Sequence, residues 1–182
     1  MNMSDADHAK KLFEEERLGR FLEAYDEVTG IRLLVLDSGE RPDFLCAFPD
    51  GSRVGVELTR SPHDYETRSH DRIWSDRSME YFDLLDAIHM IVATKSKKIK
   101  EPDWRSDQTI LVVFLEDYAF ESYDWINDGD LETEFEDFGF AEIWLADCST
   151  IEPFNAVRLI GLHPRCHWGL GDQPSLDGKP FG

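Results

Sequence analysis

The stretch from residue 40 to residue 59 constrains the fold most, because it predicts a β-hairpin with a defined register. Two short runs, residues 43–48 and 53–59, are rich in apolar side chains and are joined by the turn sequence Pro49-Asp50-Gly51. We expect a three-residue loop in which Gly51 takes the left-handed conformation. A hairpin of this kind fixes which side chains of the two strands face each other.

The three-residue loop pairs Phe44 with Val56 and Cys46 with Val54, so that one face of the hairpin is apolar. A two-residue loop would instead pair Phe44 with Glu57, which is a poor match for a half-buried sheet. The apolar register is therefore the one that we expect.

The same register places two acids, Asp43 and Glu57, opposite each other on the second face. Facing side chains on neighbouring strands have Cβ atoms only ~5 Å apart. Like charges at that separation repel, so the pair needs a compensating cation, a shared proton or a functional reason. Gly55 lies on the same face and, having no side chain, is expected to leave room beside the acids. The alternatives are an ordinary turn acid at Asp43 and, for Glu57, a salt bridge to Arg53 or Arg60.

The chain has 182 residues, of which 41% are hydrophobic and 12% aromatic, and this favours one folded domain spanning residues 1–182 over a disordered chain. Three cysteines without regular spacing, Cys46, Cys148 and Cys166, fit a reducing cytosol better than a disulfide framework. The sequence has neither a long uncharged apolar run nor an apolar N-terminal signal core. We therefore expect a soluble, cytoplasmic protein with no membrane partner.

The net charge of −19 is unevenly distributed along the chain. Residues 101–150 hold 15 acids and one base, whereas residues 60–100 hold 8 bases and 7 acids. Salt screens exposed charges beyond about 8 Å, so a basic local surface is compatible with an acidic protein. The acidic region is most simply a solvated face, and the alternatives are a protein partner bound through residues 101–150 or mimicry of nucleic acid. Assembly into a homodimer is a further hypothesis.

Hydrophobic periodicity predicts helices that alternate with strands. Helices are expected at residues 12–28 and 78–99, and strands at 31–36, in both halves of the hairpin, and at 109–115, 140–145 and 156–162. The run at 109–115 is apolar throughout, which is typical of a strand buried on both faces. Polar or irregular segments are expected at 60–75, at 118–138 (with a short helix) and from His163 onward. A helix between the hairpin and the next strand suits a right-handed crossover, so we predict an α/β fold with helices on the faces of the sheet.

Two helices can bring further charged side chains to the acid pair. On the first, Glu14 and Glu15 share a face with the apolar stripe, where an acid is costly unless it is paired or binds a metal. Solvated first-turn acids are the alternative. On the second, Lys95 continues the apolar stripe and is expected to point inward, with Lys98 near it. A lysine at the end of a buried stripe can equally extend its ammonium group to solvent.

Together, a Glu in the first helix, the string Arg41-Pro42-Asp43-Phe44 and the string Val54-Gly55-Val56-Glu57-Leu58-Thr59 resemble the PD-(D/E)XK nuclease superfamily, the restriction-endonuclease-like fold. They look most like an uncharacterised branch with the pattern PDF…GVE-x-T. The resemblance covers about residues 10–115 and leaves residues 116–182 as a C-terminal elaboration. It implies an αβββαβ core with a central mixed sheet flanked by helices, here with additional C-terminal strands.

The resemblance also implies a chemistry. In the family, the acids that match Asp43 and Glu57 bind Mg²⁺ (or Mn²⁺), and an acid of the first helix, here Glu15 or Glu14, assists. The implied activity is that of a metal-dependent nuclease, which hydrolyses phosphodiester bonds of nucleic acid. Hard divalent cations take carboxylate oxygens as ligands and keep several waters, which agrees with the acid pair.

The chain departs from the family pattern at one position, because Thr59 stands where the motif lysine is expected. Superfamily variants often supply the lysine from the following helix, and Lys95, with Lys98 as the alternative, suits that role. If neither lysine reaches the acids, the chain is a catalytically inactive interaction or regulatory protein on the same fold. The expected catalytic residues are Glu15, Asp43, Glu57 and Lys95.

Other motifs carry weaker signals. His163, Cys166 and His167 lack a second ligand pair with zinc spacing, apart from the distant Cys148. The histidines and arginines of residues 60–77 either line a phosphate-binding flank or form an ordinary polar loop. The sequence has no Gly-x-Ser-x-Gly elbow, so a Ser–His–Asp triad is discarded.

Overall fold

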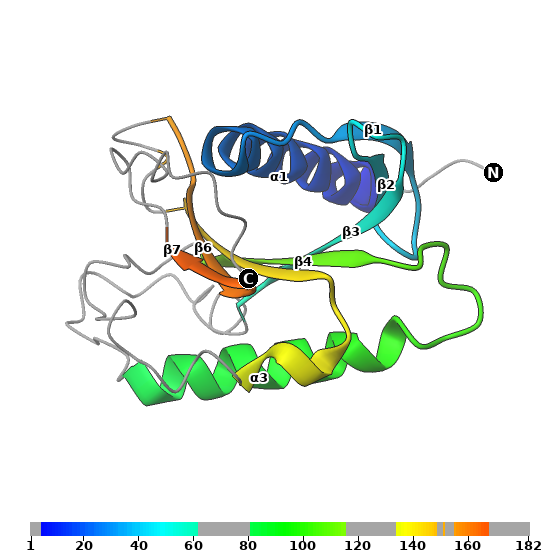
Figure 1. The fold of residues 1–182 in the computed structure, drawn as a ribbon. Helices are drawn as coiled ribbons and strands as arrows, with labels where there is room; N and C mark the ends of the chain where they lie inside the picture. Colours follow the sequence, from blue (N-terminus) through cyan, green and yellow to red (C-terminus); the bar gives the residue numbers. More distant parts are fainter. Residues whose placement is uncertain (1–4, 62–80, 116–133, 149–150, 152–154, 168–182) are drawn as a thin grey trace.

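A computed structural model of the chain describes residues 5–61, 81–115, 134–148, 151 and 155–167 (Figure 1). Helices and strands follow one another in this part of the chain in the order α1 (Asp5–Thr29), β1 (Leu34–Ser38), β2 (Phe44–Ala47), β3 (Arg53–Arg60), α3 (Tyr81–Lys98), β4 (Thr109–Leu115), the 3-10 helix η2 (Glu136–Phe138), β5 (Glu142–Asp147), β6 (Arg158–His163) and β7 (Arg165–His167).

The described strands form one seven-stranded mixed sheet, in which the strands lie in the order of the chain. The pairs from β1 to β3 are antiparallel, those from β3 to β5 are parallel, and those from β5 to β7 are antiparallel again. Helix α3 connects the parallel strands β3 and β4, as a crossover requires. Figure 1 shows α1 on one face of the sheet and α3 on the other. The prediction of an α/β fold with helices on the faces of a sheet is therefore confirmed.

The hairpin of β2 and β3 has the predicted register. Phe44 pairs with Val56 and Cys46 pairs with Val54. The loop is closed by hydrogen bonds from the Gly51 N–H to the Phe48 carbonyl and from the Phe48 N–H to the Ser52 carbonyl. Gly51 has φ 86°, the left-handed conformation that such a loop requires.

Strand β4 separates two apolar cores. Its even-numbered residues, Ile110, Val112 and Phe114, join the core beneath α1. Its odd-numbered residues, Leu111, Val113 and Leu115, join the core beneath α3. Every residue of β4 is buried, which confirms the prediction of a strand covered on both faces. On the helices, the same cores contain Leu18, Phe21 and Tyr25 of α1 and Ile88 and Val92 of α3.

The first strand differs from the prediction. It begins at Leu34 rather than Ile31, because residues 31–33 are the connection that leaves α1 after Gly30. Its apolar side chains Leu34, Val35 and Leu36 are 57%, 48% and 51% exposed, since β1 is the outermost strand of the sheet. The apolar run therefore predicts the strand correctly, but the side chains of this strand are exposed rather than buried.

The C-terminal region also differs from the prediction. Strands β5 and β6 each begin two residues later than expected. The tail was expected to be irregular, and this is wrong for Arg165–His167, which pair with β6 as β7. Backbone pairing with an edge strand needs no apolar periodicity, so the sequence pattern does not reveal it. The polar segment was expected at residues 60–75, but Arg60 is the last residue of β3. Residues 62–75, most of the segment 118–138 and the tail from residue 168 lie outside the described residues.

Candidate functional site

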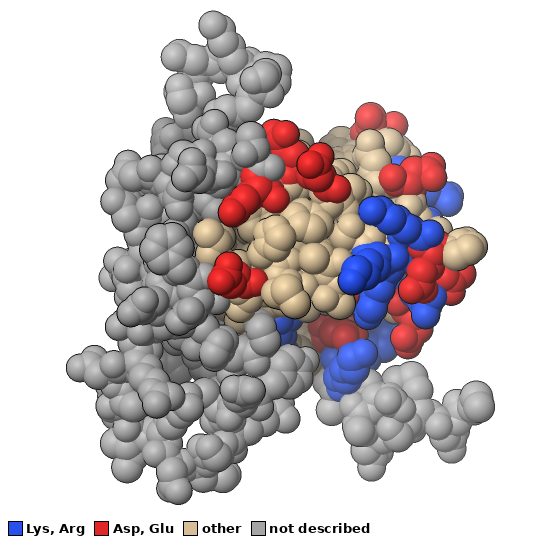
Figure 2. Space-filling view, turned by 90° about the horizontal axis from the view of Figure 1, so that it is seen from below, with Lys and Arg blue, Asp and Glu red and all other residues tan. Residues whose placement is uncertain are grey.

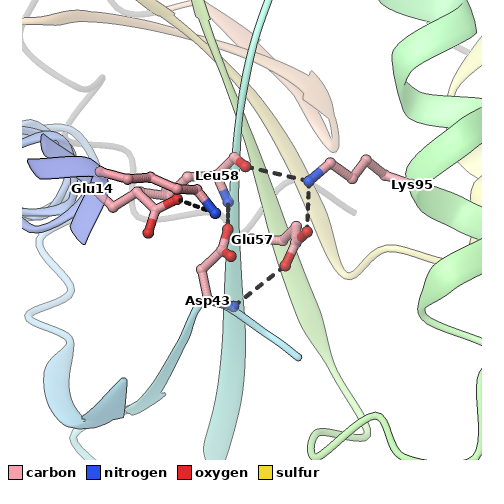
Figure 3. A network of polar contacts seen from close by, with 6 residues as sticks. Glu14, Asp43, Glu57, Leu58 and Lys95 are labelled. Atoms are coloured by element: carbon pink, nitrogen blue, oxygen red, sulfur yellow. Dashed lines mark hydrogen bonds and ion pairs between the residues drawn. The ribbon is translucent and has the colours of Figure 1, made fainter. Parts of the chain in front are cut away.

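Asp43 and Glu57 lie together at the beginning of β2, where the register of the hairpin brings them opposite each other. The Asp43 N–H donates to Glu57 Oε2 at 3.3 Å, and the Leu58 N–H donates to Asp43 Oδ2 at 2.8 Å (Figure 3). Because β2 begins only at Phe44, the Leu58 N–H extends beyond the paired part of the hairpin. The Asp43 carboxylate therefore supplies the acceptor that a longer strand would have provided.

Lys95 reaches this pair from α3. Its Nζ lies 2.6 Å from Glu57 Oε1 and 3.4 Å from the Leu58 carbonyl oxygen (Figure 3). The side chains of Lys95 and Glu57 are only 17% and 5% exposed. Lys95 follows Ile88 and Val92 on the buried face of α3, which accounts for its inward direction. Lys98 is exposed, so Lys95 is the lysine of this helix that meets the acids.

The sequence left open which basic residue pairs with Glu57, and in the structure Lys95 forms this buried ion pair. The alternatives for Glu57 were salt bridges to Arg53 or Arg60, whereas in the described part of the chain Glu57 forms an ion pair with Lys95. Arg53 is exposed, and the guanidinium of Arg60 lies over the ring of Phe13 at 3.7 Å from its centroid.

The pKa of the Asp43 carboxyl is raised above its ordinary value. Burial, the charge of Glu57 and, more weakly, that of Glu14 raise the pKa of Asp43 to about 6. The hydrogen bond from Leu58 and the charge of Lys95 act in the opposite direction, because both favour the carboxylate. Asp43 therefore loses its proton close to neutral pH, and an added cation would favour the ionised form.

The first helix brings Glu14 rather than Glu15 to Asp43. Glu14 is half-buried and lines a pocket of about 330 Å³ together with Asp43, whereas Glu15 is exposed and lines a separate groove beside Asp37. Figure 3 shows Glu14 and Lys95 on opposite sides of the Asp43–Glu57 pair. Glu14 stands one turn before Leu18 on the row of side chains that packs on the sheet, which explains the difference between the two acids.

Lys10 also belongs to this neighbourhood, and the sequence interpretation missed it. Its Nζ lies 3.4 Å from Glu14 Oε1, and its side chain is 69% exposed. The charge of Glu14 raises the pKa of Lys10 against a smaller effect of burial, and Asp43 and Glu40 add to the rise. The i,i+4 spacing from Lys10 to Glu14 was the available signal.

Gly55 has a different role from the predicted one. A Cβ at this position would lie 2.7 Å from Pro42 Cγ and 3.1 Å from Ser106 Cβ. The prediction that Gly55 leaves room beside the acids is wrong, because Pro42 and Ser106 fill that space. Glycine instead permits the close approach of Pro42, the residue before Asp43.

Ion pairs hold the turn before Asp43 against the connection between α3 and β4. Arg41 pairs with Glu101 and Asp103, and Arg105 Nη2 lies 2.8 Å from Asp37 Oδ2. The Arg105 N–H also donates to the Arg41 carbonyl at 3.3 Å. These exposed pairs contribute little stability individually, but they join the two segments that flank the acid pair.

The charge of the surface over α3 is mixed. Figure 2 shows this face, with Lys and Arg gathered toward one end and acids beside them. Lys97, Lys98 and Lys100 are exposed at the end of α3, followed by the exposed Glu101. Exposed lysines thus gather at this end of α3, but the acids beside them make the surface mixed rather than basic.

The donor set fits a hard divalent cation. Among the described residues, no three His, Cys, Asp or Glu side chains gather closely enough to hold a metal ion by themselves. The carboxylates of Asp43 and Glu57 and the neighbouring Leu58 carbonyl are all oxygen ligands, and Mg²⁺ commonly binds one or two carboxylates while keeping waters. Burial raises the pKa of Asp43 most and the charge of Glu57 raises it further, and a bound cation would relieve that repulsion.

Comparisons with protein-family models, curated proteins and solved structures found no match to this chain. The resemblance to PD-(D/E)XK nucleases therefore depends on the residues themselves. In the part of the chain that the structure describes, no helix has the length and apolar character needed to cross a membrane.

Proposed function

We propose that the protein is a divalent-cation-dependent nuclease that hydrolyses phosphodiester bonds of nucleic acid. The observation that carries the proposal is the contact between Lys95 and Glu57, with Nζ 2.6 Å from Oε1, directly beside Asp43. This lysine comes from α3 and so can replace the motif lysine that is absent at Thr59.

The order of the described elements supports a restriction-endonuclease-like core as part of this proposal. Helix α1, strands β1 to β3, helix α3 and strand β4 follow each other as α, β, β, β, α and β, the order that the resemblance implies. Asp43 immediately precedes β2 and Glu57 lies within the neighbouring strand β3, which supports the same proposal.

The residues of the site can share the work of phosphodiester hydrolysis. Asp43, Glu57 and the Leu58 carbonyl would hold Mg²⁺ or Mn²⁺. When bound, such a cation lowers the pKa of a water and offsets the charge that develops on a phosphate. The Lys95 ammonium, fixed by Glu57, can donate to the attacking water and balance phosphate charge. Glu14, on the pocket side of Asp43, can accept a hydrogen bond from water.

A nuclease assay tests this proposal. Single- and double-stranded DNA and RNA are incubated with Mg²⁺ or Mn²⁺ and with wild type, Asp43→Asn or Glu57→Gln. We expect cleavage by wild type and a loss of about 100-fold or more in either variant, since each removes a charge that the transition state needs. Asp86→Asn, which changes an exposed acid of α3, is the matched control and should retain the wild-type rate. Equal rates in all four proteins, or no cleavage by wild type, would contradict the proposal.

One observation favours a second function, a non-catalytic interaction protein on the same fold. The carboxylate oxygens Glu57 Oε1, Glu57 Oε2 and Asp43 Oδ2 already accept hydrogen bonds within the chain, from Lys95, Asp43 and Leu58. A network satisfied in this way can also serve stability alone. This alternative predicts that millimolar Mg²⁺ or Mn²⁺ leaves the melting temperature unchanged. A metal-dependent rise that disappears in Asp43→Asn would exclude it, because only ligands of the folded state stabilise it.

A further inference from the structure

Of the acid pair, Asp43 lines a pocket of about 330 Å³ next to α1, and this pocket is the open side of the pair. Three acids line this pocket, namely Glu14, Glu40 and Asp43, and Lys10 lines it as well. The Lys10 ammonium is 3.4 Å from Glu14 Oε1, so a cation of the protein itself already stands among these carboxylates.

The two lysines that serve the site are held very differently. Lys95 is 17% exposed and is bound to a carboxylate that is 5% exposed, so moving it would leave a buried charge without its partner. Lys10 is 69% exposed and contacts a half-buried carboxylate one helical turn away. Exposed i,i+4 ion pairs are weak, and a lysine chain has several rotatable bonds. Lys10 is therefore free to turn out of the pocket, whereas Lys95 is not.

We propose that Lys10 competes with the divalent cation for the open side of the acid pair, so that its ammonium lowers cation affinity until it turns away from Glu14. The identity of the cation rests on the proposed function, but the competition itself concerns only charge and position. The regulation is intrinsic to α1 and makes cation binding sensitive to one exposed side chain.

The size of the effect follows from Coulomb's law. A unit charge close to a bound cation changes the binding free energy of that cation modestly when water surrounds both, which corresponds to about threefold to tenfold in affinity for an exposed group. The effect should shrink at high salt because the Lys10 side chain is exposed.

The test is Mn²⁺ binding by the full chain, measured by titration calorimetry at low ionic strength and pH 7.5, without nucleic acid. We expect Lys10→Gln to bind Mn²⁺ about threefold to tenfold more tightly than wild type. Lys10→Arg keeps the charge and should stay within about twofold of wild type. Arg20→Gln is the matched control, because it removes a positive charge from another i,i+4 ion pair of α1, that with Glu16, which does not line this pocket, and its effect should be under about twofold.

A double-mutant cycle sharpens the result. Glu14→Gln removes the anchor of Lys10, so Lys10→Gln should tighten Mn²⁺ binding less in that background than in wild type. Unchanged or weaker binding by Lys10→Gln, or equal changes in Lys10→Gln and Arg20→Gln, would overturn the inference. Absence of Mn²⁺ binding in both wild type and Lys10→Gln would also overturn it. Tighter binding by Lys10→Gln in a protein that cleaves no nucleic acid would support the inference while contradicting the nuclease proposal.

Discussion

The two sides of the Asp43–Glu57 pair use the same residue type in different ways. On the α3 side, Lys95 is largely buried and lies 2.6 Å from Glu57. On the α1 side, Lys10 is mostly exposed and lies 3.4 Å from Glu14, at the wall of an open pocket. A buried lysine orients a carboxylate and is costly to remove, whereas an exposed lysine only offsets charge and can be displaced. The α3 side, with Lys95, is therefore a closed side that fixes the structure and orientation of the acids, and the α1 side, with Lys10, is the open side that gives access to them.

The largest expected effect is on the closed side. Lys95→Ala leaves Glu57 buried without its counter-charge and should lower the free energy of unfolding by about 3–5 kcal/mol. Urea denaturation at pH 7.5 measures this loss. Adding Glu57→Gln should restore part of the stability, because the uncompensated charge is then gone. Lys98→Ala, on the exposed face of the same helix end, should change the free energy of unfolding by less than about 0.5 kcal/mol. Similar losses in Lys95→Ala and Lys98→Ala would remove the distinction between buried and exposed lysines.

The second-largest expected effect is the pH dependence of stability that Asp43 causes. Asp43 lies between the α1 side and the α3 side of the site. Its pKa is raised to about 6 by burial and by Glu57, so the folded state holds this proton more tightly than the unfolded chain does. The stabilisation of the folded state by this proton is fully present below about pH 4, which is the ordinary pKa of an aspartate carboxyl, and it is lost as the pH rises through 6. Relative to Asp43→Asn, wild type should therefore lose about 2–3 kcal/mol of stability between pH 4 and pH 7. Urea denaturation of both proteins across this range checks the sign, and a constant difference would contradict the raised pKa.

A third prediction tests the packing behind the closed side. Gly55→Ala puts a Cβ within 2.7 Å of Pro42 Cγ and should destabilise the protein by about 1–3 kcal/mol. Gly19→Ala is the matched control, because nothing lies within 4 Å of a Cβ there and alanine favours a helix by up to about 1 kcal/mol. Thermal unfolding of the two variants should thus shift in opposite directions, and a neutral Gly55→Ala would show that the space beside the acids is free.

The smallest effect is expected on the open side. Lys10→Gln removes an exposed i,i+4 ion pair and should change the free energy of unfolding by only about 0.3 kcal/mol. Urea denaturation without metal measures this change. A loss of more than about 1 kcal/mol would give Lys10 a structural role and weaken the contrast with Lys95.

The sequence predicts those parts of the fold in which local rules leave one solution. The hairpin has only one register that places Gly51 in the left-handed position of the loop and pairs the apolar Phe44 with Val56. The uninterrupted apolar run of β4 indicates a strand buried on both faces. Lys95 could be assigned to the inward face of α3 because it continues a buried stripe.

Other parts of the site depend on details that periodicity does not contain. Glu14 and Glu15 share one helix face, and the way α1 packs on the sheet decides which of them meets Asp43. The packing of Pro42 against Gly55 is a contact between distant segments, and it fills space that the hairpin pattern alone left open. Strand β7 pairs through its backbone, which carries no pattern of side chains.

The most direct test of the nuclease proposal is the cleavage rate of Lys95 variants, since the proposal has this lysine replace the one missing at Thr59. Labelled oligonucleotides, with Mn²⁺ at 15 °C, are incubated with wild type, Lys95→Ala, Lys95→Arg and Lys98→Ala, after circular dichroism has shown that each is folded. We expect wild type and Lys98→Ala to cleave at equal rates, and both Lys95 variants to be slower by about 100-fold. Lys95→Arg keeps the charge but not the geometry, so it separates catalysis from stability. Wild-type rates in both Lys95 variants would contradict the account.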